Sequence, residues 1–499
     1  RTTSYSYDLN GNTIKKIHAN GYELTYTYDA LNRLKSQIGT LLDNRYYYDL
    51  GGNISYFFNS QNSGSAVNRW EGPLSYDAFD RLVSEMLYDG VTVKTTTYAY
   101  DKNSNRTSRI LECTGGANPN WYKETTIYTV NTLNQVASAV KTHQAITPFT
   151  NEPIGTPVNT SYNLFYNERG NLASLYDGEY TTTYLYDAYD MLVDTFKGKG
   201  EGANYKQIRT QSTYDYRGRR IKREVSSIGL TSKTKTKEYS YADGVSVLET
   251  STSGTTLTYR GSDQGGGVGG VNYTEYANGN ELNYKIYNLR GDAIKTIGAN
   301  KATKSFSHYY AFGNHDDVYG SIPNDDFRAN TKVEDDDNLL NEGKRFRHLD
   351  LGIFLTPDPL EYVDGFNPYI YCNQNPWGRW DPLGLSEITL HFYEEGVGIN
   401  DPNSGAAPAG YQSVGSEFST NIVAKGTGFE PNQIYTLASD MNLFSKNSDS
   451  GKEISSRSER EVNYFQATSD ENGNIDFGKI GNVGQDDGNP NNFVNFKKH

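Results

Sequence analysis

The feature that most constrains this chain is a short unit that recurs along it. Each unit is an alternating aromatic run that ends in Tyr-Asp or Tyr-Asn, then a turn rich in Gly, Asn and Arg, then apolar residues. Nine units are recognised by their tyrosines, which are Tyr7, Tyr28, Tyr48, Tyr76, Tyr100, Tyr166, Tyr186, Tyr214 and Tyr287. The first five tyrosines follow one another after 21, 20, 28 and 24 residues. A period of this length predicts a repeat architecture.

The chemistry of one unit predicts a β-hairpin. Residues 24–29 alternate as a strand does, and Asp29 can accept hydrogen bonds from the backbone N–H groups that follow it. Asn32 or an equivalent Gly tolerates the left-handed conformation that the turn needs, and Leu34 begins the return strand. One hairpin is marginal in water, so we expect the hairpins to pair edge to edge in a long, coiled sheet.

The composition supports an all-β fold. The chain has 42 Tyr and 49 Gly, which suit strands and the turns between them. Its net charge of -13 argues against a general nucleic-acid binder, which needs a basic surface. Cys113 and Cys372 are the only cysteines and lie far apart, so the sequence predicts no disulfide framework, metal site or cofactor. No apolar run is long enough to span a membrane.

The unit resembles the RHS/YD repeat of bacterial Rhs polymorphic toxins, of Tc-toxin C components and, more distantly, of teneurins. The resemblance covers about residues 1–385 and implies that the hairpins spiral into a hollow shell, a β-cocoon. Its repeat tyrosines and aspartates are expected to be structural, with sugar binding by the tyrosine-rich surface as the alternative.

The stretch from Phe346 to Leu385 resembles the RHS-repeat-associated core domain. In that family two Asp-Pro-x-Gly-Leu boxes are separated by 18 residues. Here Asp358 and Asp381 begin the boxes at that spacing. The second box is complete, whereas Glu361 and Tyr362 replace Gly and Leu in the first.

Two converging carboxyl groups cannot easily both ionise, so one can act as general base and the other as general acid. Asp358 and Asp381 are therefore the candidate catalytic pair of an intramolecular aspartic protease that acts once on its own chain. The resemblance places the cut between Leu385 and Ser386 and suggests Arg379 as an accompanying arginine. The alternative is that both Asp-Pro pairs only form turns in an uncut plug.

We expect three regions: shell repeats in 1–240, the core domain that closes the shell in 241–385, and a variable C-terminal domain in 386–499. The polar and acidic stretch from Ser321 to Glu342, which contains the run at residues 334–337, is expected to be a solvated loop, with a cation site as the alternative. The resemblance implies that the C-terminal domain is cargo, usually a toxin, with an immunity protein. It also implies a missing N-terminal shell or delivery component and a secreted or cell-surface location in bacteria.

The C-terminal region favours two hypotheses. It has 8 Lys and Arg against 16 Asp and Glu. This acidic balance disfavours a toxin that cuts DNA or RNA, relative to a toxin with another kind of activity. Residues 426–435 and 467–477 have the strand and turn patterns of bacterial immunoglobulin-like sandwiches, with Asn472 and Gly473 as a hairpin turn. The chain would then be a surface or wall-associated protein with an adhesive β-module rather than a toxin.

Overall fold

The computed structural model divides into two compact units, Arg1–Leu385 and Ser386–His499. In the first unit the structure describes residues 2–61, 67–88, 92–115, 121–148, 150–199, 206–228, 234–242, 245–251, 254–260, 271–276, 281–320, 326–336, 338–359, 366–379 and 381. In the second unit it describes the backbone of residues 389–396, 419–427, 434–442, 460–468 and 475–484.

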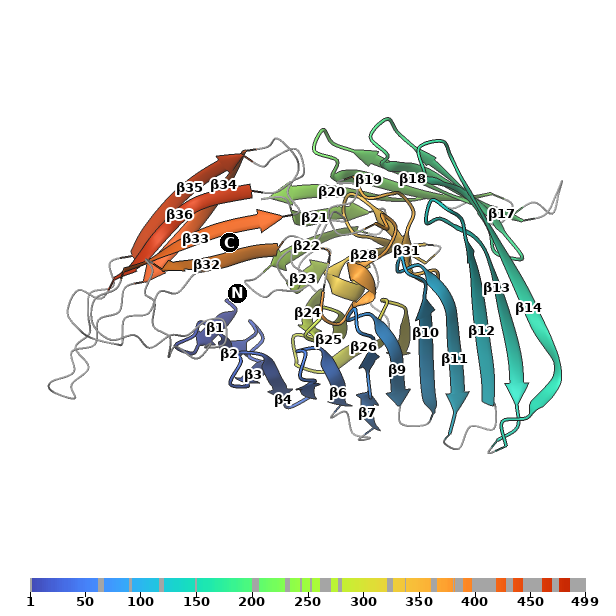
Figure 1. Cartoon of the computed structure of the whole chain (residues 1–499), viewed down its shortest axis with the longest axis horizontal. Helices are drawn as coiled ribbons and strands as arrows, with labels where there is room; N and C mark the ends of the chain where they lie inside the picture. Colours follow the sequence, from blue (N-terminus) through green and yellow to red (C-terminus); the bar gives the residue numbers. More distant parts are fainter. Residues whose placement is uncertain are drawn as a thin grey trace. The chain divides into compact units, whose positions relative to one another are not determined.

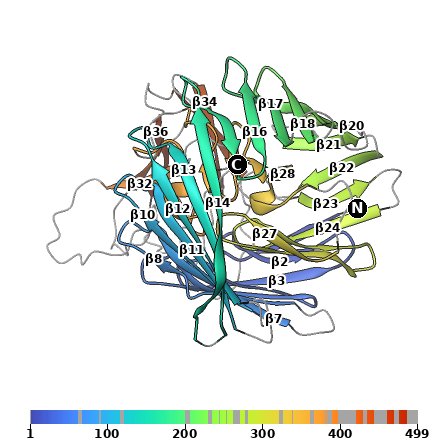
Figure 2. The same cartoon turned by 90° about the vertical axis from the view of Figure 1, so that its right-hand side faces the viewer.

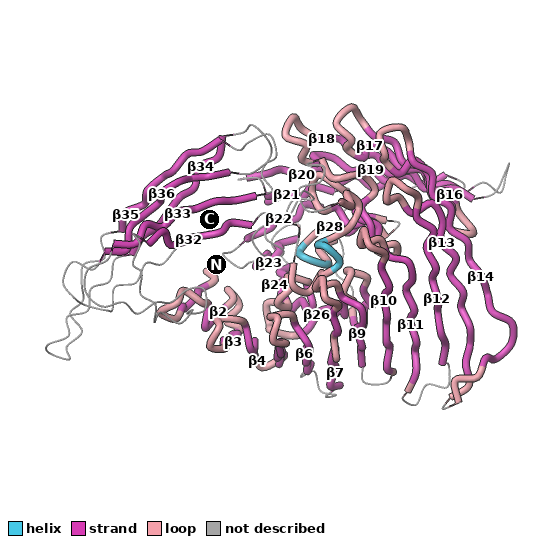
Figure 3. The backbone as a smooth tube through the Cα atoms, viewed as in Figure 1, coloured by secondary structure: helices cyan, strands magenta, loops and turns pink. Residues whose placement is uncertain are grey.

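A single antiparallel sheet of 27 strands makes up most of the first unit (Figures 1 and 3). The strands are β1 (Ser4–Tyr7), β2 (Thr13–Ile17), β3 (Glu23–Tyr28), β4 (Leu34–Gly39), β5 (Leu42–Tyr48), β6 (Ile54–Gln61), β7 (Val67–Glu71), β8 (Ser75–Tyr76), β9 (Leu82–Tyr88), β10 (Val93–Tyr100), β11 (Arg106–Thr114), β12 (Trp121–Val130), β13 (Val136–Ile146), β14 (Pro153–Tyr166), β15 (Leu172–Tyr176), β16 (Thr181–Tyr186), β17 (Leu192–Lys199), β18 (Lys206–Tyr214), β19 (Arg220–Ile228), β20 (Thr234–Ala242), β21 (Val245–Ser251), β22 (Gly254–Arg260), β23 (Val271–Tyr276), β24 (Glu281–Tyr287), β25 (Ala293–Ile297), β26 (Thr303–Tyr309) and β27 (His315–Tyr319). Nearly every strand pairs with the next one in the chain, and β9 pairs with β7, β8 and β10. The prediction of an all-β chain built from successive hairpins is confirmed.

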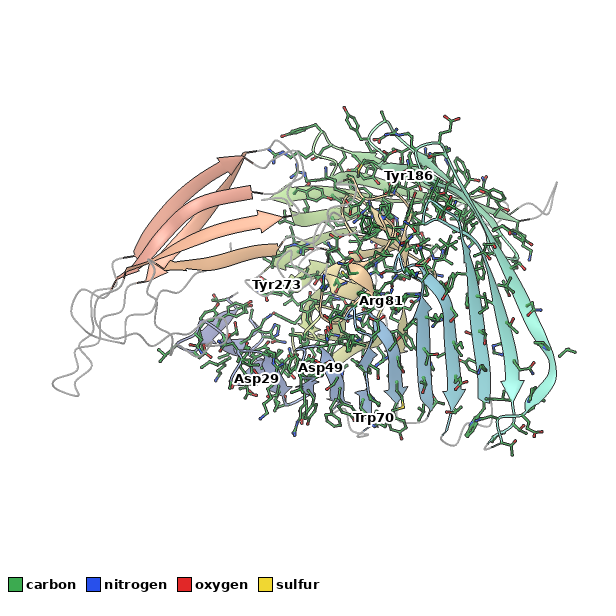
Figure 4. The ribbon with its side chains drawn as sticks, viewed as in Figure 1. Asp29, Asp49, Trp70, Arg81, Tyr186 and Tyr273 are labelled. Carbon is green, nitrogen blue, oxygen red and sulfur yellow. The ribbon has the colours of Figure 1, made fainter. Side chains whose placement is uncertain are left out.

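The Tyr-Asp turns have the predicted hydrogen bonds. Asp29 Oδ1 accepts from the N–H groups of Leu31 and Arg33, both at 2.9 Å, and the Asp49 turn follows one unit later (Figure 4). The third residue after the Asp or Asn has a positive φ in ten turns: Gly11, Asn32, Gly52, Asp80, Ser104, Asn134, Gly170, Asp190, Gly218 and Gly291. Asp and Ser also occupy this position, so its conformation is set by the turn and is not reserved for Gly and Asn.

In most repeat units the tyrosine joins its unit to the one before it. The Tyr186 hydroxyl, for example, donates to the carbonyl of Leu172, the first residue of β15, at 2.8 Å. The same bond, to the first residue of the preceding return strand, is made by Tyr28, Tyr48, Tyr76, Tyr100, Tyr214, Tyr241 and Tyr287. These hydroxyl groups are therefore used within the sheet, as the structural interpretation of the tyrosines predicts.

The sheet curls until its late strands meet its early ones (Figure 2). The Tyr5 hydroxyl donates to Asn272 Oδ1 at 2.9 Å, although the two residues are 267 positions apart. The Tyr46 hydroxyl accepts the Leu289 N–H at 2.8 Å. Leu289 packs with Tyr46 in one of the buried apolar clusters of the unit. Hydrogen bonds and apolar contacts thus join one winding of the sheet to another.

A small sheet follows the large one in the chain (Figure 1), and its residues Leu339, Phe346 and Ile353 share a buried apolar cluster with residues of the large sheet. Its strands are β28 (Val333–Asp335), β29 (Leu339–Asn341), β30 (Phe346–His348) and β31 (Ile353–Phe354), with the short 3-10 turns η3 (Ala329–Thr331) and η4 (Cys372–Gln374) nearby. Residues 366–375 lie along a row of repeat turns. Contacts from this segment reach Asn53, Asn103, Ser104, Asn105, Asn134, Gln135 and Gly170.

The prediction of a solvated loop is wrong for Glu334 and Asp335, which lie in strand β28, whereas Asp336 is exposed in the turn that follows. Asp335 lies in β28, is buried, and forms an ion pair with Arg220. Asp336 pairs with Arg223 at 2.8 Å. The arginines come from β19, a pairing across more than a hundred residues that the local charge pattern does not reveal.

The second unit has five described strands in two antiparallel sheets. β32 (Thr389–Gly396), β33 (Ser419–Thr427) and β36 (Ile475–Gly484) form one sheet, and β34 (Ile434–Asn442) pairs with β35 (Arg460–Thr468) in the other. Asn472 and Gly473 lie outside the described residues, but the strands on either side of them belong to different sheets. The predicted hairpin at this turn is therefore wrong, while the prediction of a β-rich region is confirmed.

In the part of the chain that the structure describes, no helix has the length and hydrophobicity needed to cross a lipid bilayer.

Candidate active site: a carboxylate pair bridged by Arg345

Arg345 is held by the tight turn between β29 and β30. The Glu342 N–H donates to the Arg345 carbonyl at 3.0 Å, and Asn341 Oδ1 accepts the Gly343 N–H at 2.9 Å. Gly343 has φ 121°, a conformation that side-chain-bearing residues rarely adopt. The turn fixes Arg345 directly before the buried strand β30.

Asp358 follows β31 on a segment anchored to two sheets. The Leu355 N–H donates to the Phe346 carbonyl at 2.9 Å, and the Leu355 carbonyl accepts the Leu172 N–H at 2.8 Å. These bonds attach the segment to β30 on one side and to β15 on the other. Asp358 lies three residues beyond this anchor, with its side chain 8% exposed.

Asp381 follows the turn that contains η4. Asn375 organises this turn, because its Oδ1 accepts the Gly378 N–H at 2.9 Å and its carbonyl accepts the Arg379 N–H at 3.1 Å. The Asn375 side chain also donates to Asn53 Oδ1 in a repeat turn at 2.9 Å. Asp381 is thereby placed in the interior of the first unit, where its side chain is 6% exposed.

One guanidinium nitrogen brings the two aspartates together. Arg345 Nη2 lies 2.8 Å from Asp358 Oδ2 and 3.2 Å from Asp381 Oδ2. The two carboxylate oxygens can therefore be no more than about 6 Å apart, the sum of these distances. The guanidinium also stacks on the Phe354 ring at 3.7 Å, and its Nη1 donates to the Pro368 carbonyl at 3.2 Å. Ring stacking and three polar partners leave the guanidinium little freedom to turn away.

The environment of Asp381 favours its protonated form. The pKa of Asp381 is raised to about 7, chiefly by burial, with Glu342 and Asp358 adding to the rise and Arg345 and Lys332 opposing it. Near neutral pH, Asp381 thus carries a proton for a large part of the time. A proton donor beside a carboxylate paired with arginine is the combination that general acid–base hydrolysis of a peptide needs.

The structure brings Asp358 and Asp381 together, and it adds Arg345, which the sequence interpretation missed. Arg379 lies two residues before Asp381 and is partly buried, and its catalytic role stays a prediction. Leu385 and Ser386 lie outside the described residues. A signal for Arg345 exists in the sequence: residues 341–343 are Asn-Glu-Gly, a turn pattern between the pair Leu339-Leu340 and Phe346, which predicts a hairpin before the first box.

Among the described residues, no group of three or more His, Cys, Asp or Glu side chains could hold a metal ion.

Comparisons with known proteins bear on the repeats. The family model described as RHS Repeat matches residues 7–40. The tRNA nuclease WapA of Bacillus subtilis strain 168 is 30% identical over 402 residues, or 77% of this chain. The chain is an RHS-repeat protein. The tRNA3(Ser)-specific nuclease WapA of Bacillus spizizenii is 28% identical over 401 residues, again 77% of this RHS-repeat chain.

The RHS-repeat chain spans only 15% of the length of each of these two relatives. A solved structure, the complex TcdB2-TccC3-Cdc42, is similar in fold with a TM-score of 0.50 and 18% identity. The similarity covers 77% of the RHS-repeat chain and 19% of that chain. It shows that the repeats adopt the fold of a Tc-toxin shell.

Proposed function

We propose that this chain is part of an RHS shell of the polymorphic-toxin type, which cuts its own backbone after Leu385 and thereby separates residues 386–499 as cargo. Residues 1–240 would supply shell repeats, and residues 241–385 would supply the core domain that closes the shell and holds the cutting site. The observation that carries the proposal is the bridging of Asp358 and Asp381 by Arg345 Nη2.

The proposed reaction uses the difference between the two aspartates. Asp358, at 2.8 Å from the arginine, acts as the base that removes a proton from the attacking water. Asp381, with its raised pKa, gives a proton to the leaving amine of Ser386. Water adds to the Leu385 carbonyl, the C–N bond breaks, and a new carboxylate and amine are formed. No cofactor enters this scheme.

Intact-mass measurement of the full 499-residue chain tests the proposal. We expect the wild-type chain to give two fragments that meet at Leu385 and Ser386, and the Asp358→Asn and Asp381→Asn chains to stay whole. Asp187→Asn is a matched control, since it makes the same change in a repeat turn where the chain elsewhere has Asn131 and Asn167. An uncut wild-type chain, or an Asp381→Asn chain cut as fast as wild type, would contradict the proposal.

The cargo has two candidate roles. The two WapA relatives are named as tRNA nucleases, and an enzymatic cargo of this kind, together with the Tc-toxin fold of the shell, supports a toxin. The two small antiparallel sheets of the second unit support an adhesive immunoglobulin-like module on a secreted or cell-surface protein instead. Expression of residues 386–499 in bacterial and eukaryotic cells separates them: growth arrest, relieved by an immunity protein in a bacterial host, supports the toxin, and unchanged growth supports the module.

A further inference from the structure

A third buried carboxylate lies next to the Asp358–Asp381 pair. Glu342 is fully buried, and its Oε1 forms an ion pair with Arg347 Nε at 2.8 Å. Its Oε2 lies 4.0 Å from Lys332 Nζ, which also donates to the Glu342 backbone carbonyl at 3.1 Å. Lys332 is buried as well, and burial lowers its pKa. Placing a carboxylate and two cations here costs desolvation free energy, which apolar residues of similar size would avoid.

Glu342 is linked to the candidate active site by a backbone hydrogen bond. Its N–H donates to the Arg345 carbonyl at 3.0 Å and so closes the turn that presents the Arg345 guanidinium. Arg347, which holds the Glu342 carboxylate, is itself fixed by stacking on the Tyr371 ring at 3.8 Å. A displacement of Glu342 would therefore move Arg345 relative to the two aspartates.

Glu342 and Lys332 also interact electrostatically with Asp381. Arg345, Glu342, Lys332 and Asp358 are among the charged groups that act on Asp381. Cys372 is close too, but burial raises the pKa of its thiol well above the usual value and keeps it neutral. Glu342 raises the pKa of Asp381 and Lys332 lowers it, so the two side chains act in opposite directions on one proton.

We propose that Glu342 and Lys332 are positioning residues of the cutting reaction, which together set how readily Asp381 holds its proton while Glu342 keeps Arg345 between the two carboxylates. The inference rests on the proposed self-cleavage and extends it to residues outside the Asp-Pro boxes. A purely structural pair would change the amount of folded protein without changing the pH at which cleavage fails.

The test is the pH profile of cleavage in the full chain. Chain prepared unfolded in urea is diluted into buffers from about pH 5 to about pH 9, and the uncut fraction is followed by intact mass. Removing the charge of Glu342 with Glu342→Gln should move the alkaline fall in rate to lower pH by about one unit. Lys332→Met should move the same fall to higher pH by a similar amount.

Glu334→Gln is the matched control, because it removes a carboxylate that pairs with His315 at 2.9 Å in the same small sheet. Its profile should match that of the wild type. Shifts of opposite sign in the two variants support the inference. If wild type is cut but the profiles of Glu342→Gln and Lys332→Met coincide with it or move in the same direction, the inference alone is overturned. If the wild-type chain is never cut, the proposed function fails and the inference fails with it.

Discussion

Arg220 in β19 and Asp335 in β28 form a buried, two-pronged ion pair across 115 residues of sequence. Arg220 Nη2 donates to Asp335 Oδ1 at 2.9 Å, and Nη1 donates to the other oxygen of the same carboxylate. Their side chains are 3% and 6% exposed. This pair attaches the small sheet, and with it the turn of Arg345, to the wall of repeats.

Replacing Arg220 should destabilise the first unit strongly. Arg220→Met leaves the Asp335 carboxylate buried with fewer partners, which typically costs about 3–5 kcal/mol. The urea midpoint followed by tryptophan fluorescence should fall well below that of wild type, whereas Arg217→Met, at an exposed repeat turn, should leave it nearly unchanged. Equal midpoints for the two variants would contradict the assignment.

The same pair predicts a loss of stability in acid. Burial would raise the pKa of Asp335, but Arg220 and Arg223 outweigh it and hold the pKa below its usual value of 3.8. The stabilisation is therefore fully present above pH 3.8 and is lost as the pH falls through the lowered pKa. The destabilisation caused by Arg220→Met should accordingly shrink as the pH falls below 3.8. An effect that grows in acid would be inconsistent with this sign.

Arg345 should be needed for its shape as well as its charge. Arg345→Lys keeps a cation but loses the planar group that bridges Asp358 and Asp381 while stacking on Phe354. We expect cleavage to slow by about a hundredfold or more, a loss of about 3 kcal/mol of transition-state stabilisation. Lys344→Arg, one residue earlier in the turn, is the control and should cut at the wild-type rate.

The hydrogen bond that links neighbouring repeat units can be tested by removing one hydroxyl oxygen. Tyr186→Phe loses the hydrogen bond to the Leu172 carbonyl and should destabilise the sheet by about 1 kcal/mol. Tyr176→Phe is matched to it, because that hydroxyl donates only to Gly178, two residues away in an exposed turn. Equilibrium unfolding should show a clear loss for the first variant and little for the second.

The repeat turn should depend on an acceptor oxygen rather than on charge. Asp187 Oδ1 accepts the N–H groups of Tyr189 at 2.8 Å and Met191 at 3.0 Å. Asp187→Asn keeps that oxygen and should be nearly neutral, whereas Asp187→Ala should cost about 1–2 kcal/mol. Equal losses in the two variants, measured by urea unfolding, would show that the charge matters instead.

Local chemistry explains why so much of the first unit could be predicted. The Asp29 turn needs only an acceptor, a residue that tolerates positive φ and a strand on either side, and all three lie within a few residues. The two Asp-Pro boxes could also be recognised, because the spacing between Asp358 and Asp381 is read directly from the sequence. Arg345 was missed because its role depends on the folded chain, in which the turn between β29 and β30 brings it into contact with Asp358 and Asp381 from two other segments.

Long-range pairing also explains the errors. The charge run at Asp335 looks solvated until β19 brings Arg220 and Arg223 to it. Asn472 and Gly473 have the residue types of a hairpin turn, yet β35 and β36 join different sheets. A two-residue pattern cannot by itself distinguish a hairpin from a crossover, because strand pairing also depends on residues outside the pattern.

The backward hydrogen bond made by eight tyrosines of the sheet has a consequence for how such chains can change in length. The first carbonyl of a unit's return strand accepts a hydrogen bond from the tyrosine of the next unit, and the unit's own tyrosine donates the same bond to the unit before it. Inserting or deleting a whole unit therefore leaves every bond of this kind made, whereas a partial unit would strand one carbonyl such as that of Leu172. Growth by intact modules would therefore let the length of the sheet change while the hydrogen bonds between neighbouring units are kept.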